Sequence, residues 1–352
     1  MTAPIIYEDT IESIDLIDDN VLVGPNYDIL TKHIMPGGLE VPPIGLGSSD
    51  DLKKNDNQKI SQFLNAIESG YRLIDTAYKY DNQRHLGLAI RQLMDTTNIT
   101  RNDLIVVTKV WSTFHTRERA FENVKMELQD LQFDYSDFGL IHYPISITPH
   151  ESNPREYFTY SANGSIQTPY PQRDVGYLEA WRGLEAAERL GLVKYIGLAN
   201  FNIHQIKRIL SVAVVKPVVV QVECHPLYRN DKLTNWIKAH NMSVMCYSPL
   251  RKCSPELVNN NVLQEVADKH KRTVYQVSLR WNMQRGHIVI PRSFDKHHQK
   301  ENLDSLNFAL DQQDMDKINA IPQLQKIIYP GNLLPISMPS HPDYPFGEDD
   351  DN

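Results

Sequence analysis

Short, nearly continuous apolar runs alternate along the chain with longer segments of helical periodicity. Eight of the short runs predict β-strands. They cover residues 42–47, 72–77, 104–110, 138–143, 195–200, 218–224, 243–248 and 287–292. These runs lack the strict alternation of polar and apolar positions that a half-exposed sheet shows. They are typical of a parallel sheet that is covered on both faces.

The segments between the runs predict amphipathic helices. Residues 58–69 place their apolar side chains on one stripe, and Gly70 follows as a helix-ending residue. Residues 118–131 and 274–283 show a similar pattern, and Asp174 is a candidate cap for one more helix. Eight strands that alternate with helices over about 250 residues predict an α/β fold, the (β/α)8 TIM barrel.

A doubly wound sheet is the competing fold for alternating strands and helices. It normally carries a glycine fingerprint after its first strand. Here Gly45 and Gly47 are followed by Ser48, Ser49 and Asp50, so the third glycine of that fingerprint is missing. We therefore favour the barrel.

Composition and charge exclude several other classes of protein. The 352 residues are 41% hydrophobic and 23% charged, which is typical of a globular protein rather than a disordered or fibrous one. No window approaches the roughly 18 apolar residues of a membrane span, and the N-terminus lacks the pattern of a secretory signal. The net charge of −8 gives no reason to expect nucleic-acid binding. We expect a cytoplasmic monomer that acts on a small molecule.

Acidic residues gather at both ends of the chain. Residues 1–20 hold six acids, residues 341–352 hold five, and neither segment has a Lys or Arg. Both ends resemble solvated tails. We therefore divide the chain into an acidic N-terminal extension (1–26), a catalytic barrel (27–320), and a C-terminal rim segment with an acidic tail (321–352).

The three cysteines, Cys224, Cys246 and Cys253, form no CxxC pair. Their number and spacing predict neither a disulfide framework nor a zinc knuckle. Cys224 and Cys246 lie within predicted strands and are expected in the core. The pair of Glu223 and His225 is only a weak metal signal, so we expect no metal site.

In a barrel, active-site groups come from the C-terminal ends of the strands. Those ends supply Asp75 with Tyr80, Lys109 and His142. An ammonium near a phenol favours the phenolate, so Lys109 is expected to lower the pKa of Tyr80, and Asp75 to keep Lys109 charged. With His142 orienting a carbonyl oxygen, the four would form a proton donor for an oxygen that gains negative charge.

The sequence resembles the aldo-keto reductase family, and in particular its aldose-reductase-like branch. The resemblance covers about residues 27–346 and rests on seven motifs in the family order. These are GYRLIDTAYKYDNQRHLG, VTKVW, LIHYP, GLANFN, QVECHP, YSPL and IPRSFDKHHQKENL. The resemblance implies NADPH-dependent, reversible reduction of an aldehyde or ketone. It also implies a cofactor that lies extended across the barrel mouth without a Rossmann motif.

The resemblance implies a role for each matched position. Tyr80 would be the general acid, tuned by Lys109 and Asp75, and His142 would orient the substrate. Tyr247 would stack on the nicotinamide. The other implied cofactor-binding residues are Ser48, Asn200, Gln221, Ser248, Leu250, Arg292, Ser293, His298, Glu301 and Asn302. The implied substrate pocket consists of Ser49, Trp111 and Tyr143.

Several positions depart from the family pattern. Ser49 stands where the family has a bulky Trp, and Tyr143 also stands where a Trp is common. The other departures are Gln83 for Glu, Ala199 for Ser, Arg251 for Gly, Arg292 for Lys and His298 for Arg. Because Arg can clamp a phosphate with two parallel hydrogen bonds, NADPH is still expected over NADH.

Two other functions stay open from the sequence. One is a barrel that binds the cofactor with little catalysis, which the departures at Ser49, Gln83, Ala199 and Arg251 would allow. The other is a lyase or isomerase that uses Lys109 as a Schiff base. NADPH oxidation separates the first from a reductase, and borohydride trapping separates the second.

Overall fold

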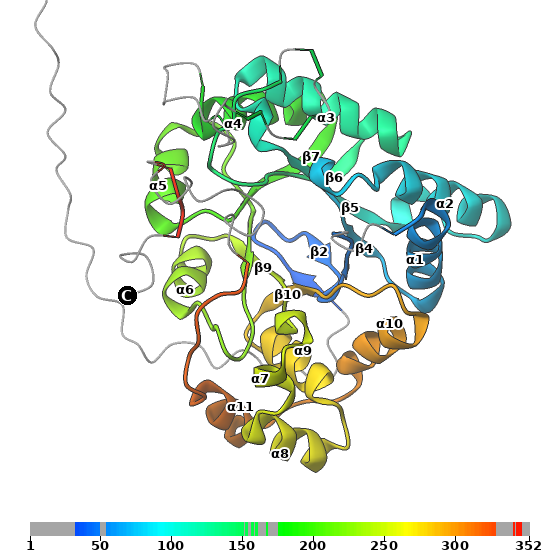
Figure 1. The fold of residues 1–352 in the computed structure, drawn as a ribbon, viewed down its shortest axis with the longest axis vertical. Coiled ribbons are helices and arrows are strands. Elements are labelled where there is room, and N and C mark those ends of the chain that lie inside the picture. The colour runs from blue at the N-terminus through cyan, green and yellow to red at the C-terminus, as the bar shows by residue number, and fades with distance from the viewer. Residues whose placement is uncertain are drawn as a thin grey trace, which may run out of the picture.

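The computed structural model describes residues 32–49, 54–150, 175–328, 341 and 343–346, with a few single positions between 151 and 174. Its central element is an eight-stranded parallel sheet (Figure 1). The strands are β3 (Leu46–Gly47), β4 (Leu73–Asp75), β5 (Ile105–Val110), β6 (Ser136–Ile141), β7 (Val193–Ala199), β8 (Val219–Glu223), β9 (Ser243–Tyr247) and β10 (His287–Ile290). Each of them overlaps one of the eight predicted runs.

The sheet closes on itself between its first and last strands. Parallel bridges join Ile44 to Val289 and Gly47 to Arg292. The Gly45 N–H donates to the carbonyl of Val289 at 2.8 Å, and the Gly47 N–H donates to that of Pro291 at 2.9 Å. The predicted (β/α)8 barrel is therefore confirmed.

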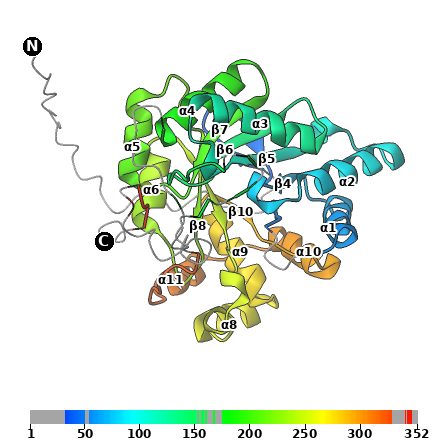
Figure 2. The ribbon, with the colours of Figure 1, turned by 45° about the horizontal axis from the view of Figure 1, so that its top comes forward.

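Helices surround the barrel wall and are drawn around it in Figures 1 and 2. The α-helices are α1 (Asp56–Ser69), α2 (Gln83–Thr96), α3 (Arg117–Leu131), α4 (Tyr177–Arg189), α5 (Ile203–Val212), α6 (Asp231–Ala239), α7 (Pro255–Val258), α8 (Asn261–His270), α9 (Val274–Gln284), α10 (Lys296–Leu303) and α11 (Gln312–Asn319). Short 3₁₀ turns are η1 (Tyr78–Tyr80), η2 (Arg101–Asp103), η3 (Ser112–Phe114), η4 (Arg251–Cys253) and η5 (Asp304–Asn307).

Local signals at the helix ends explain several boundaries. Asn55 forms a capping box with Gln58 at the start of α1, and Gly70 ends that helix with a φ of 116°. Thr273 forms a capping box with Gln276 at the start of α9. Helix α4 begins after Gly176; the candidate cap Asp174 lies outside the described residues.

A short antiparallel hairpin, β1 (His33–Ile34) with β2 (Glu40–Val41), precedes the barrel. Its side chains Met35 and Val41 are buried in one cluster with residues from the barrel interior, including Leu73 and Phe138. His33 Nε2 lies 3.2 Å from the hydroxyl of Ser243, the first residue of β9. The hairpin therefore covers the N-terminal end of the barrel, opposite the strand ends that were predicted to carry chemistry.

The structure bears on the predicted tails only in part. The N-terminal extension lies outside the described residues, as does much of the segment after Ile328. Among the residues that are described, none of the helices is both long and apolar enough to cross a membrane.

Candidate active site

Lys109 and Asp75 form a buried ion pair between two neighbouring strands. The Lys109 Nζ lies 2.6 Å from the Asp75 carboxylate and also donates to the Thr76 carbonyl at 3.0 Å and to the Tyr80 hydroxyl at 3.3 Å. An ammonium has three protons, and three acceptors surround this one. Lys109 is fully buried, so these contacts hold a charge where water cannot. The predicted contact between Tyr80 and Lys109 is present.

The environment of Tyr80 differs from the expectation. The pKa of Tyr80 lies well above 10, because burial disfavours the phenolate and because the negative charge of Asp75 repels it. The expected lowering by Lys109 is therefore corrected: Asp75, only 2.6 Å from the ammonium, offsets its charge. The phenol is protonated at neutral pH, which is the form that can donate a proton.

His142 follows the last residue of β6 and packs beside Tyr80. The two ring centroids are 5.6 Å apart with their planes nearly perpendicular. Burial, followed by the charges of Lys109 and Lys79, holds the pKa of His142 well below 6.5. Its Nδ1 is buried and has no hydrogen-bond partner among the residues that the structure describes. The ring is thus a neutral imidazole with hydrogen-bonding capacity left over.

Three residues on or directly after β7, β8 and β9 are hydrogen-bonded to this group. The Tyr247 hydroxyl donates to the side-chain oxygen of Asn200 at 2.7 Å, and the Asn200 amide donates to the His142 carbonyl at 2.9 Å. The Gln221 amide donates at 2.8 Å to the same Asp75 oxygen that accepts from Lys109. The side chains that were expected to hold a nicotinamide therefore share partners with the predicted catalytic residues.

These side chains face one cavity of about 520 Å³ at the C-terminal mouth of the barrel. That volume lies in the range typical of small-molecule and cofactor sites. The predicted site residues that line it are Ser48, Ser49, Asp75, Tyr80, Trp111, His142, Tyr143, Asn200, Gln221, Tyr247, Ser248, Leu250 and Arg292. Lys109 lies beneath this surface, in contact with Tyr80.

The other predicted cofactor residues lie beside the cavity rather than in its lining. Ser293 directly follows Arg292, and the other three lie on α10: His298, Glu301 and Asn302. His298 is exposed, with its N–H bonded to Asp295, whereas Asn302 is buried. The structure therefore places these four residues after Arg292 along the chain, three of them on α10, and their role stays a prediction.

Some cavity residues were not expected from the sequence. Lys79 lines the cavity with its ammonium 3.9 Å from the ring centroid of Tyr157. Its position next to Tyr80 was the only available signal. Ile328 also lines the cavity, although it lies far beyond β9 (Ser243–Tyr247) in sequence.

Glu223 explains why Ile328 reaches the cavity. Its two carboxylate oxygens accept the backbone N–H groups of Ile327 and Ile328 at 2.8 and 2.9 Å. His225 lies 3.1 Å from the same carboxylate, fully buried. Glu223, with His225 beside it, therefore anchors the C-terminal segment to the end of β8.

Comparisons with known proteins agree with this geometry. The model of the "Aldo/keto reductase family" matches residues 43–323. The chain is 33% identical to the NAD(P)H-dependent 6'-deoxychalcone synthase of Glycine max, over 82% of this chain and 90% of that protein. It is 34% identical to aldo-keto reductase family 1 member A1 of Bos taurus, over 88% of this chain and 96% of that protein.

A solved structure gives the same answer. The aldose reductase from Schistosoma japonicum superposes with a TM-score of 0.82 and 29% identity, covering 91% of this chain and 99% of that one. The chain therefore belongs to the aldo/keto reductase family, in its aldose-reductase branch, and is an NAD(P)-dependent oxidoreductase that acts on carbonyl or alcohol groups.

Proposed function

We propose that this enzyme reduces an aldehyde or ketone with NADPH and that Tyr80 donates the proton. The observation that carries the proposal is the chain of contacts from Asp75 through Lys109 to the Tyr80 hydroxyl, set beside a neutral His142 in the cavity. A protonated phenol and a neutral imidazole are both donors for a carbonyl oxygen that gains negative charge.

The donor set of the cavity fits a nicotinamide dinucleotide. Tyr247 offers an aromatic face, Asn200 and Gln221 offer amides, and Arg292 and Lys252 add cations to the same lining. These are the groups needed for a ring, a carboxamide and phosphates. When bound, the cofactor supplies the hydride that reduces the carbonyl carbon.

The protein's own residues would donate the proton and stabilise the phenolate that remains. Tyr80 releases its proton to the substrate oxygen, and the Lys109 N–H that points to the hydroxyl at 3.3 Å stabilises the phenolate that remains. Asp75 keeps Lys109 charged, and Gln221 fixes the position of Asp75. His142 donates to the same substrate oxygen and orients it. In the direction of alcohol oxidation, the phenolate takes the proton back.

The preference for NADPH is inferred from the residues that would bind the adenosine end of the cofactor. Arg292 lines the cavity and donates to the Ser49 carbonyl at 2.8 Å, which fixes the guanidinium at the mouth. We propose that it binds the 2′-phosphate, with Ser293, His298, Glu301 and Asn302 on the same side. Ser49 leaves the substrate side of the mouth without the bulky ring common in the family.

The Schiff-base alternative finds no support in the position of Lys109. A Schiff base requires a neutral amine that a substrate carbon can reach. Lys109 is fully buried, is paired with Asp75, and has an acceptor for each of its three protons. Borohydride with a carbonyl substrate should therefore leave the enzyme unmodified.

The substitution Tyr80→Phe tests the proton donor. We expect turnover of a reducible aldehyde to fall about 10²- to 10⁴-fold, whereas NADPH binding, followed by fluorescence quenching, stays near that of the wild type. Tyr135→Phe is the matched control, because Tyr135 lies before β6 at the opposite end of the barrel and its hydroxyl bonds Asn102. Wild-type turnover in Tyr80→Phe would refute the role. A wild-type protein that binds NADPH but oxidises none with a broad carbonyl panel would be a binding protein instead.

A further inference from the structure

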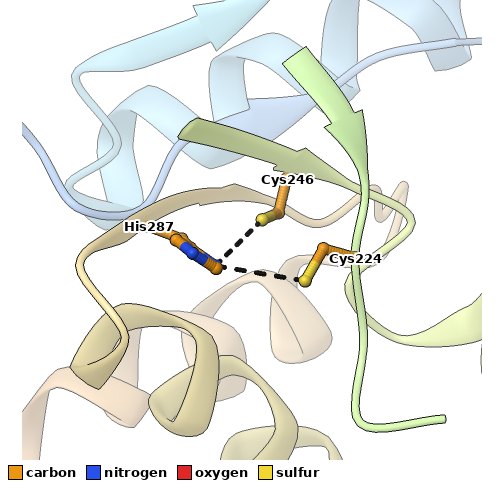
Figure 3. A group of neighbouring side chains, drawn as sticks. All are labelled: Cys224, Cys246 and His287. Carbon is orange, nitrogen blue, oxygen red and sulfur yellow. Dashed lines mark hydrogen bonds between the residues drawn. The ribbon is translucent and has the colours of Figure 1, made fainter. Parts of the chain in front are cut away.

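A second group of reactive side chains lies outside the active site, at Cys224, Cys246 and His287 (Figure 3). Cys224 follows β8, Cys246 lies on β9, and His287 begins β10, so three adjacent strands supply them. All three side chains are fully buried. Because side chains alternate along a strand, Cys246 faces the helix layer whereas its neighbour Tyr247 faces the cavity.

A fourth ligand atom comes from α9. The side-chain oxygen of Asn282 lies 3.3 Å from the Cys224 sulfur, 3.7 Å from the Cys246 sulfur and 3.3 Å from His287 Nδ1. His287 Nδ1 lies 4.0 Å from the first sulfur and 3.5 Å from the second. Four ligand atoms therefore surround one point in the layer between the barrel wall and α9.

These separations are those of a tetrahedral metal site. Zinc bonds of ~2.3 Å to sulfur and ~2.0–2.1 Å to nitrogen or oxygen place neighbouring ligand atoms roughly 3.3–3.8 Å apart. The longest of these five separations, 4.0 Å, needs to shorten by only a few tenths of an ångström, and the two sulfurs lie within 4.8 Å of each other. The side chains therefore need little rearrangement to close around an ion.

The orientation of each ligand is fixed by its surroundings. The Asn282 amide nitrogen donates to the Cys224 carbonyl at 3.2 Å, which turns the amide oxygen toward the two thiols. Arg285 donates to the Cys224 sulfur at 3.4 Å, a contact that favours the thiolate, and its own charge is offset by an ion pair with Asp231. His287 Nε2 is buried and lacks a partner in the described part of the chain, so packing and the contacts of Nδ1 hold the ring.

We propose that Cys224, Cys246, His287 and Asn282 bind one zinc ion that ties α9 to the ends of β8, β9 and β10. Two soft thiolates and an imidazole are the ligands that zinc selects, and two thiolates balance its charge. Binding releases the two thiol protons to solvent and forms two zinc–sulfur bonds. The sequence predicted no metal site, because the ligands come from four separate elements and show no characteristic spacing.

The first test uses the full-length wild-type protein. After incubation with zinc chloride and dialysis against metal-free buffer, we expect close to one zinc per chain by elemental analysis. Cobalt in place of zinc should give tetrahedral ligand-field bands in the visible region and a thiolate charge-transfer band in the near ultraviolet. Retention of no zinc, or a cobalt spectrum of an octahedral, sulfur-free site, overturns the proposal. A disulfide between Cys224 and Cys246 found by mass spectrometry in the freshly purified protein also overturns it.

Variants assign the site. Cys246→Ala and His287→Ala should lose the bound zinc, and zinc should raise the thermal midpoint of the wild type but not of these two. Cys253→Ala is the matched control, because Cys253 is an exposed cysteine outside the cluster, and it should keep the zinc. Equal zinc retention in Cys246→Ala and Cys253→Ala overturns the assignment. If a variant fails to fold, the cobalt spectrum of the wild type decides alone.

Discussion

Glu127 is a buried carboxylate directly behind the proposed proton donor. It lies on α3, and one of its oxygens accepts the backbone N–H groups of Tyr78 and Lys109 and the amide of Gln83. Its other oxygen is buried without a partner within the described ranges. Burial raises the pKa of Glu127 to about 7, against those three hydrogen bonds. Glu127 therefore holds the turn that carries Tyr80, and its contribution to the free energy of unfolding depends on pH.

The raised pKa of Glu127 predicts that the stability of the fold depends on pH. Between pH 4.5 and about 7 the folded chain keeps a proton on Glu127 that the unfolded chain has lost, so the free energy of unfolding falls as pH rises. The loss is on the order of 3 kcal/mol. A glutamine has no proton to lose, so Glu127→Gln should gain stability over the wild type at pH 8 relative to pH 5, measured by urea unfolding. The exposed Glu122→Gln on the same helix should follow the wild type at both pH values. An equal difference at both pH values in Glu127→Gln would contradict this account.

Arg292 gives a second prediction at this scale. If its guanidinium reads the 2′-phosphate, Arg292→Ala removes a charge-assisted hydrogen bond and should raise the Kd for NADPH roughly 10- to 100-fold. The Kd for NADH, measured in the same variant by fluorescence quenching, should change much less. NADH serves as the internal control, because loss of the bond to the Ser49 carbonyl affects both cofactors. Equal losses would show that Arg292 does not select the phosphate.

Sequence reasoning predicted which residues lie together where the proposed chemistry requires them to be close. The contacts of Lys109 with Tyr80 and Asp75 were predicted because a buried lysine needs a partner and because strand ends converge in a barrel. The direction of the pKa shift of Tyr80 was not predicted correctly. It depends on whether burial and the charge of Asp75, which raise the pKa, outweigh the ammonium of Lys109, which lowers it. Glu127 was also missed, because an acid in an amphipathic helix pattern predicts an exposed side chain.

At the scale of elements, a glycine allows α2 and α3 to approach closely. A Cβ on Gly87 would lie 2.2 Å from the Leu131 carbonyl oxygen, which is backbone at the end of α3 and cannot move aside. In an open helix, Gly→Ala stabilises by about 0.5–1 kcal/mol. Here we expect Gly87→Ala to destabilise by about 1–3 kcal/mol in urea unfolding, because the helices must separate. The neighbouring Leu88→Ala, with a 40% exposed side chain, should change stability by less than about 0.5 kcal/mol. A stabilised Gly87→Ala would mean that the two helices can move apart freely.

The strands were predictable because each is a buried apolar run, but their ends were less so. The predicted strand at 138–143 begins two residues earlier, at Ser136, and ends at Ile141, which leaves His142 and Tyr143 beyond the strand. Ser136 and Asp137 are polar, and their side chains have partners: Thr108 for Ser136 and Arg101 for Asp137. The β1–β2 hairpin was missed because two-residue strands carry no periodic pattern.

At the scale of the whole molecule, the two ends of the barrel have different tasks. The C-terminal mouth holds the cavity, whereas the hairpin closes the N-terminal end. Met35 is 1% exposed and belongs to one buried cluster with Val107, Phe138 and Met245, which lie on three different strands. A cluster that several strands share stabilises the closed barrel rather than one element. The stability of the distant active-site end should therefore depend on Met35.

Substitution of Met35 tests that dependence. Met35→Ala leaves a cavity inside the barrel and should lower the free energy of unfolding by about 2–5 kcal/mol. Ile34→Ala is the control, since Ile34 is the adjacent residue of the hairpin and its side chain is 68% exposed, so the change should stay within about 0.5 kcal/mol. Because the barrel wall is one continuous closed sheet, NADPH-dependent activity should be lost at the same lowered temperature as helical signal. Two outcomes would show that the hairpin is a surface appendage and not part of the barrel core. One is an equal loss of stability in Met35→Ala and Ile34→Ala. The other is enzymatic activity that persists at temperatures where the helical signal is already lost.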